Sequence, residues 1–265
     1  MHWVRNIECL AHDYSVWVPD LPGMGDSDYP LAADFPVITP GESDIDISDS
    51  NGLPPSAIPM QTHVAVMIEG LSQLFGATPV PVVGFSFGGT LSANVAALVP
   101  GRFSRVILVG SGGVPGERPV RPEMISWRQI ADAEELAAVH RRNLEIHLIV
   151  DPRNVDEMAV NIQTLNTGHF RGRRLQRRQS LFEVLAHGRP RLAGIWGRHD
   201  HTARGRVGEL AGILRGIDPD APFHVVEKGG HWVAYECADE VNCTLLRFLA
   251  EQTTDHTRRT TETAI

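Results

Sequence analysis

Short apolar runs alternate with segments of helical periodicity along most of the chain, and this alternation limits the possible folds more than any other feature. Strands that alternate with helices predict an α/β fold with a mostly parallel sheet covered by helices on both faces. The helical segments are represented by residues 64–75 and 241–249, whose apolar side chains recur at spacings of three and four. The predicted buried strands are Ser15 to Val18, Val80 to Phe85, Arg105 to Val109, Leu192 to Trp196 and Phe223 to Val226.

Two stretches interrupt the alternation. Residues 30–59 are rich in Pro, Ser and Asp and predict a long surface loop; calcium binding is the weaker alternative, because the ordered Gly and terminal Glu of a calcium loop are missing. Residues 115–188 contain helical patterns without a convincing strand, which predicts a helical cap inserted between two strands. The predicted core is therefore formed by residues 1–114 and 189–252, and residues 253–265 form a flexible polar tail.

Composition excludes several classes of protein. A length of 265 residues with 42% hydrophobic residues suffices for one large domain with an inserted subdomain. The net charge of -8 disfavours a nucleic-acid partner. The first residues carry charge and no long apolar run, so they resemble neither a signal peptide nor a membrane span. Cys9, Cys237 and Cys243 lack metal-ligand spacing, which argues against disulfides and zinc. We therefore expect a soluble, cytoplasmic protein without a membrane partner.

The segment "VVGFSFGGT", residues 82–90, has the pattern G-x-S-x-G between a predicted strand and a predicted helix. This is the context of a nucleophile elbow, a tight turn that exposes a reactive serine. We expect the glycines at positions 84 and 88 to let neighbouring backbones approach, and Ser86 to lie at the helix N-terminus, where developing negative charge is stabilised. The alternative interpretation is an ordinary glycine-rich turn.

A serine hydroxyl is a weak nucleophile without a base and a carboxylate that orients the base. Two later segments offer these groups in the order acid, then histidine. "LAGIWGRHDHT" is an apolar strand followed by Asp200, and "FHVVEKGGHWVAYE" is a strand followed by a Gly-Gly turn and His231. Each residue follows the carboxyl end of a strand, at the sheet edge where Ser86 emerges and where open α/β sheets bind ligands. The sequence therefore predicts that these three side chains meet.

Other residues of similar type have simpler interpretations. His199 and His201 flank Asp200, but neighbours on an extended chain point to opposite sides, which disfavours a metal site. Asp26 and Asp28 are interpreted as loop residues that bond to the local backbone. We expect no metal and no other cofactor. The remaining histidines without a matching motif are interpreted as structural or solvated: His12, His63, His140, His147, His169, His187 and His224.

Over nearly its whole length the chain resembles the α/β-hydrolase family. Four segments carry the resemblance, namely "VWVPDLPGMGDSD", "GFSFGG", "WGRHD" and "GGHWVAYE". It implies that Ser86 is the nucleophile, His231 the general base, Asp200 the orienting acid, and the backbone N–H of Phe87 one donor of the oxyanion hole. Serine at position 86 argues against the dehalogenase branch, which has an aspartate nucleophile there.

The predicted cap contains a basic segment, residues 169–181, in which Arg171, Arg174 and Arg178 have helical spacing. A solvated basic face is the simpler interpretation. The alternative is that one of them, with Arg174 and Arg178 as candidates for substrate binding, holds a substrate carboxylate through a bidentate contact. The small-molecule substrate would then be acidic.

An arginine-bearing cap together with Trp232, directly after His231, is similar to the meta-cleavage product hydrolases, which cut carbon–carbon bonds in vinylogous diketo acids. Trp232 is therefore a further predicted substrate contact. The elbow of those enzymes usually has asparagine where this chain has Phe85. We therefore favour hydrolysis of a small carboxylic ester through an acyl-enzyme, with carbon–carbon hydrolysis as the alternative.

The resemblance also implies an expectation about the start of the chain. Members of the family normally begin with two or three strands and a loop that supplies a second oxyanion N–H, and we expect this chain to lack them. Losing one such donor costs about 100- to 1,000-fold in kcat. A start codon placed too far downstream is the favoured explanation, ahead of a genuinely shortened protein. An impaired ligand-binding protein on a hydrolase scaffold is the alternative from another class, and an exposed sheet edge would permit a homodimer.

Overall fold

The computed structural model describes residues 2–29, 58, 60–114, 123–169, 180–203 and 205–262. Within them the sheet has the order β1 (Val80–Phe85), β2 (Phe103–Val109), β3 (Leu192–Gly197) and β4 (Phe223–Val226). All three neighbouring pairs are parallel, so the carboxyl ends of the four strands lie at one edge. The last four predicted strands are thus confirmed.

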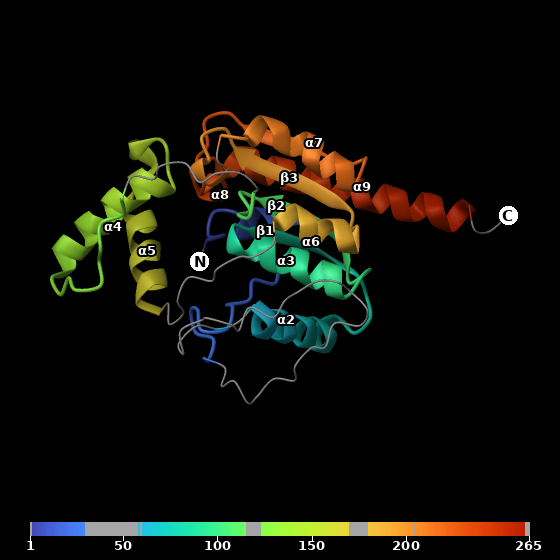
Figure 1. Cartoon of the computed structure of the whole chain (residues 1–265), viewed down its shortest axis with the longest axis horizontal. Helices are drawn as coiled ribbons and strands as arrows, with labels where there is room; N and C mark the ends of the chain where they lie inside the picture. The colour runs from blue at the N-terminus through green and yellow to red at the C-terminus, as the bar shows by residue number, and fades with distance from the viewer. Residues whose placement is uncertain are drawn as a thin grey trace.

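Side chains alternate between the two faces of this sheet, and each face has its own covering helices. Along β2, Val106 and Leu108 join one apolar cluster while Ile107 and Val109 join another. The first cluster is covered by α2 (Met60–Phe75), α3 (Phe87–Leu98), α6 (Leu181–Gly188) and α7 (Val207–Ile217), of which α2, α3 and α6 lie side by side in Figure 1. The second is covered by α1 (Ile7–Ala11), α8 (Val233–Glu236) and α9 (Ala238–Glu262). The predicted α/β fold, with helices on both faces, is confirmed.

The prediction of a strand from Ser15 to Val18 is wrong. The segment is not part of the sheet, because among the described residues the four strands of the sheet pair only with one another. Val16 packs against the second apolar cluster, whereas Trp17 is 59% exposed and meets the ring of Phe75 edge-on at 5.8 Å. The alternating apolar pattern therefore reflects packing without the backbone partner that makes a strand.

The helices of the predicted cap belong to two different environments. α4 (Ala133–His147) and α5 (Glu157–His169), joined through the short η1 (Pro152–Asn154), stand together to one side of the sheet (Figure 1). They form a separate apolar cluster, which includes Leu144 of α4 and Val160 and Ile162 of α5. α6 differs, because Leu181 and Leu185 are buried against the layer that covers the sheet. Most of residues 115–188 that the structure describes are helical, but α6 packs with the core.

The C-terminal helix α9 continues to Glu262, through residues that the sequence assigned to a polar tail (Figure 1). None of the helices in the described part of the chain is long and apolar enough to cross a membrane. The predicted surface loop lies almost entirely outside the described residues.

His63 on α2 is a buried histidine at the contact between two core helices. Its side chain is 3% exposed, and its ring lies 5.3 Å from the ring of Phe87 on α3. Its Nδ1 has no hydrogen-bond partner among the described residues. Burial disfavours the charged ring and lowers the pKa of His63 from 6.5 to about 4.

This burial predicts a loss of stability in mild acid. Between pH 6.5 and pH 4 the unfolded chain binds a proton that folded His63 does not, so the contribution of His63 is complete above pH 6.5 and declines as the pH falls. At pH 5 the loss relative to pH 7 is about 2 kcal/mol. Urea denaturation at the two pH values should show that His63→Leu loses less stability on acidification than the wild type. Equal losses in the two proteins would refute the assignment.

Candidate active site

Ser86 occupies the turn between β1 and α3 in an unusual backbone conformation. Its φ is 49° and its ψ is -110°. Residues other than glycine rarely adopt this backbone conformation, which costs them about 1–3 kcal/mol. Three backbone hydrogen bonds hold it there: its N–H donates to the carbonyl of Val109 at 3.1 Å, and its carbonyl accepts from the N–H groups of Gly112 at 3.4 Å and Thr90 at 3.5 Å. The turn places the hydroxyl at the carboxyl edge of the sheet.

Close backbone contacts explain the glycines of this turn. A Cβ on Gly84 would lie 2.5 Å from the Cα of Gly89, and a Cβ on Gly89 would lie 1.8 Å from Oγ of Ser111. Apart from its chain neighbours and the backbone of its own helix, no atom of the described residues lies within 4 Å of a Cβ built on Gly88. The expectation for Gly84 is confirmed, but the one for Gly88 is wrong, because it is Gly89, one position further around the helix, that faces back onto β1.

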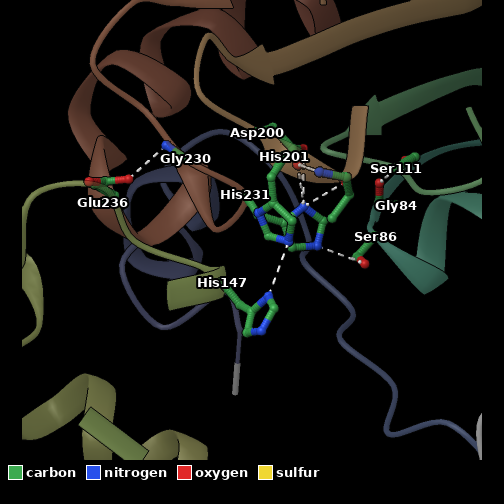
Figure 2. Close-up of polar contacts among 10 residues, drawn as sticks. Gly84, Ser86, Ser111, His147, Asp200, His201, Gly230, His231 and Glu236 are labelled. Carbon is green, nitrogen blue, oxygen red and sulfur yellow. Dashed lines mark hydrogen bonds and ion pairs between the residues drawn. The ribbon is translucent and has the colours of Figure 1, made fainter. Parts of the chain in front are cut away.

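Three predicted residues meet at this edge (Figure 2). Oγ of Ser86 lies 3.0 Å from Nε2 of His231, whose Nδ1 lies 3.0 and 3.1 Å from the two carboxylate oxygens of Asp200. Ser86 follows β1, Asp200 follows β3 and His231 follows β4, so the parallel sheet brings them together. The prediction that these side chains meet is confirmed.

The carboxylate of Asp200 is fully buried and well supplied with donors. Its Oδ1 accepts hydrogen bonds from the backbone N–H of Thr202 at 2.8 Å and from its hydroxyl at 2.7 Å. Burial is the largest influence on its pKa and raises it, but the charge of His231 and the hydrogen bonds from His231 and Thr202 outweigh burial and lower the pKa below 3.8. Asp200 is therefore ionised at neutral pH.

No role for Thr202 was predicted from the sequence. The pattern that could have indicated this role is Asp200 followed two residues later by Thr202, which can donate both a backbone N–H and a hydroxyl. This pattern is typical of an Asx-type turn.

This arrangement is suited to proton transfer from a hydroxyl. A serine oxygen 3.0 Å from an imidazole nitrogen can lose its proton to the ring, and an ionised carboxylate on the far nitrogen stabilises the imidazolium that forms. Phe87 is the first residue of α3, and its N–H belongs to the first turn, whose amides have no intrahelical acceptor. A developing negative charge beside Ser86 would therefore meet a favourable helix N-terminus.

One of the histidines beside Asp200 contacts a histidine of α4. His201, in η2 (His201–Ala203), has its Nε2 3.3 Å from Nδ1 of His147 at the end of α4 (Figure 2). No sequence pattern predicted that His147 would lie here. Within the described residues, no group of three or more His, Cys, Asp or Glu side chains could hold a metal ion.

Trp232 is only 1% exposed. Its indole N–H donates to the carbonyl of His2 at 3.0 Å, and its ring stacks on Tyr235 at 4.3 Å. Trp232 also belongs to the apolar cluster formed by α4 and α5, and its contact with a substrate stays a prediction. Arg174 and Arg178 lie outside the described residues.

Comparisons with known proteins agree with the α/β fold described above. A family model described as "alpha/beta hydrolase fold" matches residues 1–140. The 2-hydroxy-6-oxo-6-phenylhexa-2,4-dienoate hydrolase of Burkholderia cepacia is 28% identical over 94% of this chain and 82% of its own length. A meta-cleavage product hydrolase from Pseudomonas fluorescens superimposes with a TM-score of 0.65 at 21% identity, covering 94% of this chain and 85% of its own. A thermophilic esterase from Thermogutta terrifontis gives 0.63 at 17% identity, covering 95% and 85%.

The glycine contacts generate a paired test. Gly84→Ala pushes a Cβ into the backbone of α3 and should lower the free energy of unfolding by about 1–3 kcal/mol. Gly88→Ala meets open space inside a helix and should leave stability unchanged or raise it by up to about 1 kcal/mol. Thermal and urea denaturation of the two variants measure the difference, and equal destabilisation by both would contradict the packing described.

Proposed function

The chain belongs to the α/β-hydrolase fold family, and we propose that it hydrolyses its substrate through an acyl-enzyme formed on Ser86. The hydrogen-bond chain from Ser86 through His231 to the buried Asp200 is the observation that supports this proposal most directly. The strained turn supports it further, because a backbone held in a rare conformation is typical of a functional site.

In the proposed mechanism, His231 takes the proton of Ser86 as its oxygen attacks a carbonyl carbon of the substrate. Asp200 stabilises the imidazolium, and the N–H of Phe87 is one donor to the oxyanion. The leaving group departs with the proton from His231. Water then gives its proton to His231 and attacks the acyl group, which releases a carboxylic acid and restores Ser86.

We propose a vinylogous diketo acid as the substrate class. The sequence patterns alone favoured an ester, but the Burkholderia relative carries the name of a dienoate hydrolase and its match covers 94% of this chain. In such a substrate the carbonyl fragment stays on Ser86, and the carbon–carbon bond breaks with its electron pair on the departing carbon. The conjugated system delocalises that pair, and the departing fragment takes the proton that His231 received from Ser86. Arg174 or Arg178 of the predicted cap would bind the substrate carboxylate.

Hydrolysis of a small carboxylic ester is the second candidate. The ring of Phe85 lies 5.1 Å from the ring of His231, so an apolar side chain borders the proposed base at the position where meta-cleavage product hydrolases usually have asparagine. A ligand-binding protein without catalysis is the alternative from another class, and covalent labelling distinguishes it from either enzyme.

Labelling with a fluorophosphonate tests the proposed nucleophile. The wild type should form an adduct on Ser86, and Ser86→Ala should form none. Asp200→Asn should slow turnover by about 10⁴-fold, because the imidazolium and its orientation lose their support. Ser72→Ala, which changes an exposed serine on α2, is the control and should label like the wild type. An adduct that survives Ser86→Ala would contradict the proposal.

A comparison of substrates tests the proposed class. The value of kcat/KM for 2-hydroxy-6-oxo-6-phenylhexa-2,4-dienoate should exceed that for short p-nitrophenyl esters, and both activities should disappear in Ser86→Ala. Arg174→Leu or Arg178→Leu should raise KM for the acidic substrate only. Turnover of esters without turnover of the dienoate would replace the first candidate by the second.

A further inference from the structure

Glu236, the last residue of α8, is buried. Both oxygens of its carboxylate accept hydrogen bonds from backbone N–H groups, and these groups belong to two separate segments. Its Oε1 accepts from Val150 at 2.8 Å and from Asp151 at 2.7 Å, both just after α4. Its Oε2 accepts from Gly230 at 2.7 Å (Figure 2). Hydrogen bonds to an ionised acceptor are about twice as strong as neutral ones, so Glu236 is a strong bridge between the two segments.

The segment held by Oε2 directly precedes the proposed base. Gly230 is bound to Glu236, and on the other side of His231 the N–H of Trp232 donates to the carbonyl of Leu148 at 2.8 Å. Both neighbours of His231 are therefore tied to the same part of the chain, either through Glu236 or directly, and that part is residues 148–151.

The loop that carries Asp200 also contacts the turn that precedes His231. The carbonyl of Gly229 accepts from the N–H of His199, the residue before Asp200, at 3.0 Å. A Cβ on Gly230 would lie 2.9 Å from the carbonyl oxygen of Leu148 and 3.2 Å from Oε2 of Glu236, so the backbones are already in contact. The backbone around His231 is thus held between the loop that carries Asp200 and residues 148–151 after α4.

We propose that Glu236 is a positioning residue, which keeps the ring of His231 aligned with Ser86 and Asp200. This alignment then depends on the position of residues 148–151. The inference rests on the proposed function, since alignment of the ring matters for rate only if His231 is the base. A displacement of about 1 Å in a catalytic group costs on the order of 100-fold in rate.

Glu236→Gln is the most informative variant. It keeps the size of the side chain but has one acceptor oxygen, so its NH₂ group faces a backbone N–H on one of the two segments. Tyr235→Phe is the matched control on the same short helix. It removes the hydrogen bond from the Tyr235 hydroxyl to Oδ1 of Asp156 at 2.5 Å, a contact between α8 and the segment before α5 that leaves Gly230 untouched.

The experiment measures three quantities at a temperature where each variant is folded: the rate of fluorophosphonate labelling of Ser86, kcat and KM for the best substrate, and the free energy of unfolding. Glu236→Gln should slow labelling and lower kcat by about 10- to 100-fold with KM changed less than about 3-fold. Tyr235→Phe should lose stability but keep its labelling rate and kcat within about 3-fold of the wild type.

Equal labelling rates in folded Glu236→Gln and Tyr235→Phe would overturn the inference and leave Glu236 with a structural role only. If Glu236→Gln does not fold, Glu236→Asp takes its place; it keeps the charge but is one methylene too short to reach both segments, and the same outcomes apply. A wild type that is not labelled on Ser86 would overturn the proposed function itself, together with this inference. Labelled wild type with unaffected Glu236 variants overturns the inference alone.

Discussion

The geometry of the site depends on places where backbones touch because glycine has no side chain. Gly84 brings β1 against Gly89 of α3, and a Cβ on Gly197 at the end of β3 would lie 2.2 Å from the carbonyl oxygen of Gly230. The first contact fixes the turn that carries Ser86, and the second fixes the turn that carries His231. A side chain at either place would separate the segments by more than a hydrogen bond tolerates.

Much of this arrangement could be predicted from the sequence, because it follows from local patterns and one general rule. Ser86, Asp200 and His231 each follow a short apolar run, and parallel strands place their carboxyl ends at one edge. The alternation of apolar positions likewise predicted that both faces of the sheet would be covered. These inferences needed no knowledge of which residues touch across the chain.

The parts that could not be predicted depend on contacts between distant segments. Ser15 to Val18 has the composition of a strand, but a strand requires a pairing partner that composition does not supply. Glu236 resembles any polar helix residue until the fold brings Asp151, 85 positions away, to its carboxylate. The choice between Gly88 and Gly89 depends on which helix face meets β1, and His147 is brought near His201 only by the path of α4.

The conformation of Ser86 has a consequence for how such a sequence is maintained. A glycine at this position would adopt the observed φ of 49° without the strain that serine bears. Selection for stability alone would therefore drive the position toward glycine. Under the proposed function, selection for activity opposes this drive and keeps the hydroxyl. In a chain with a marginal free energy of folding, that local trade-off limits how many further destabilising substitutions the rest of the fold can accumulate.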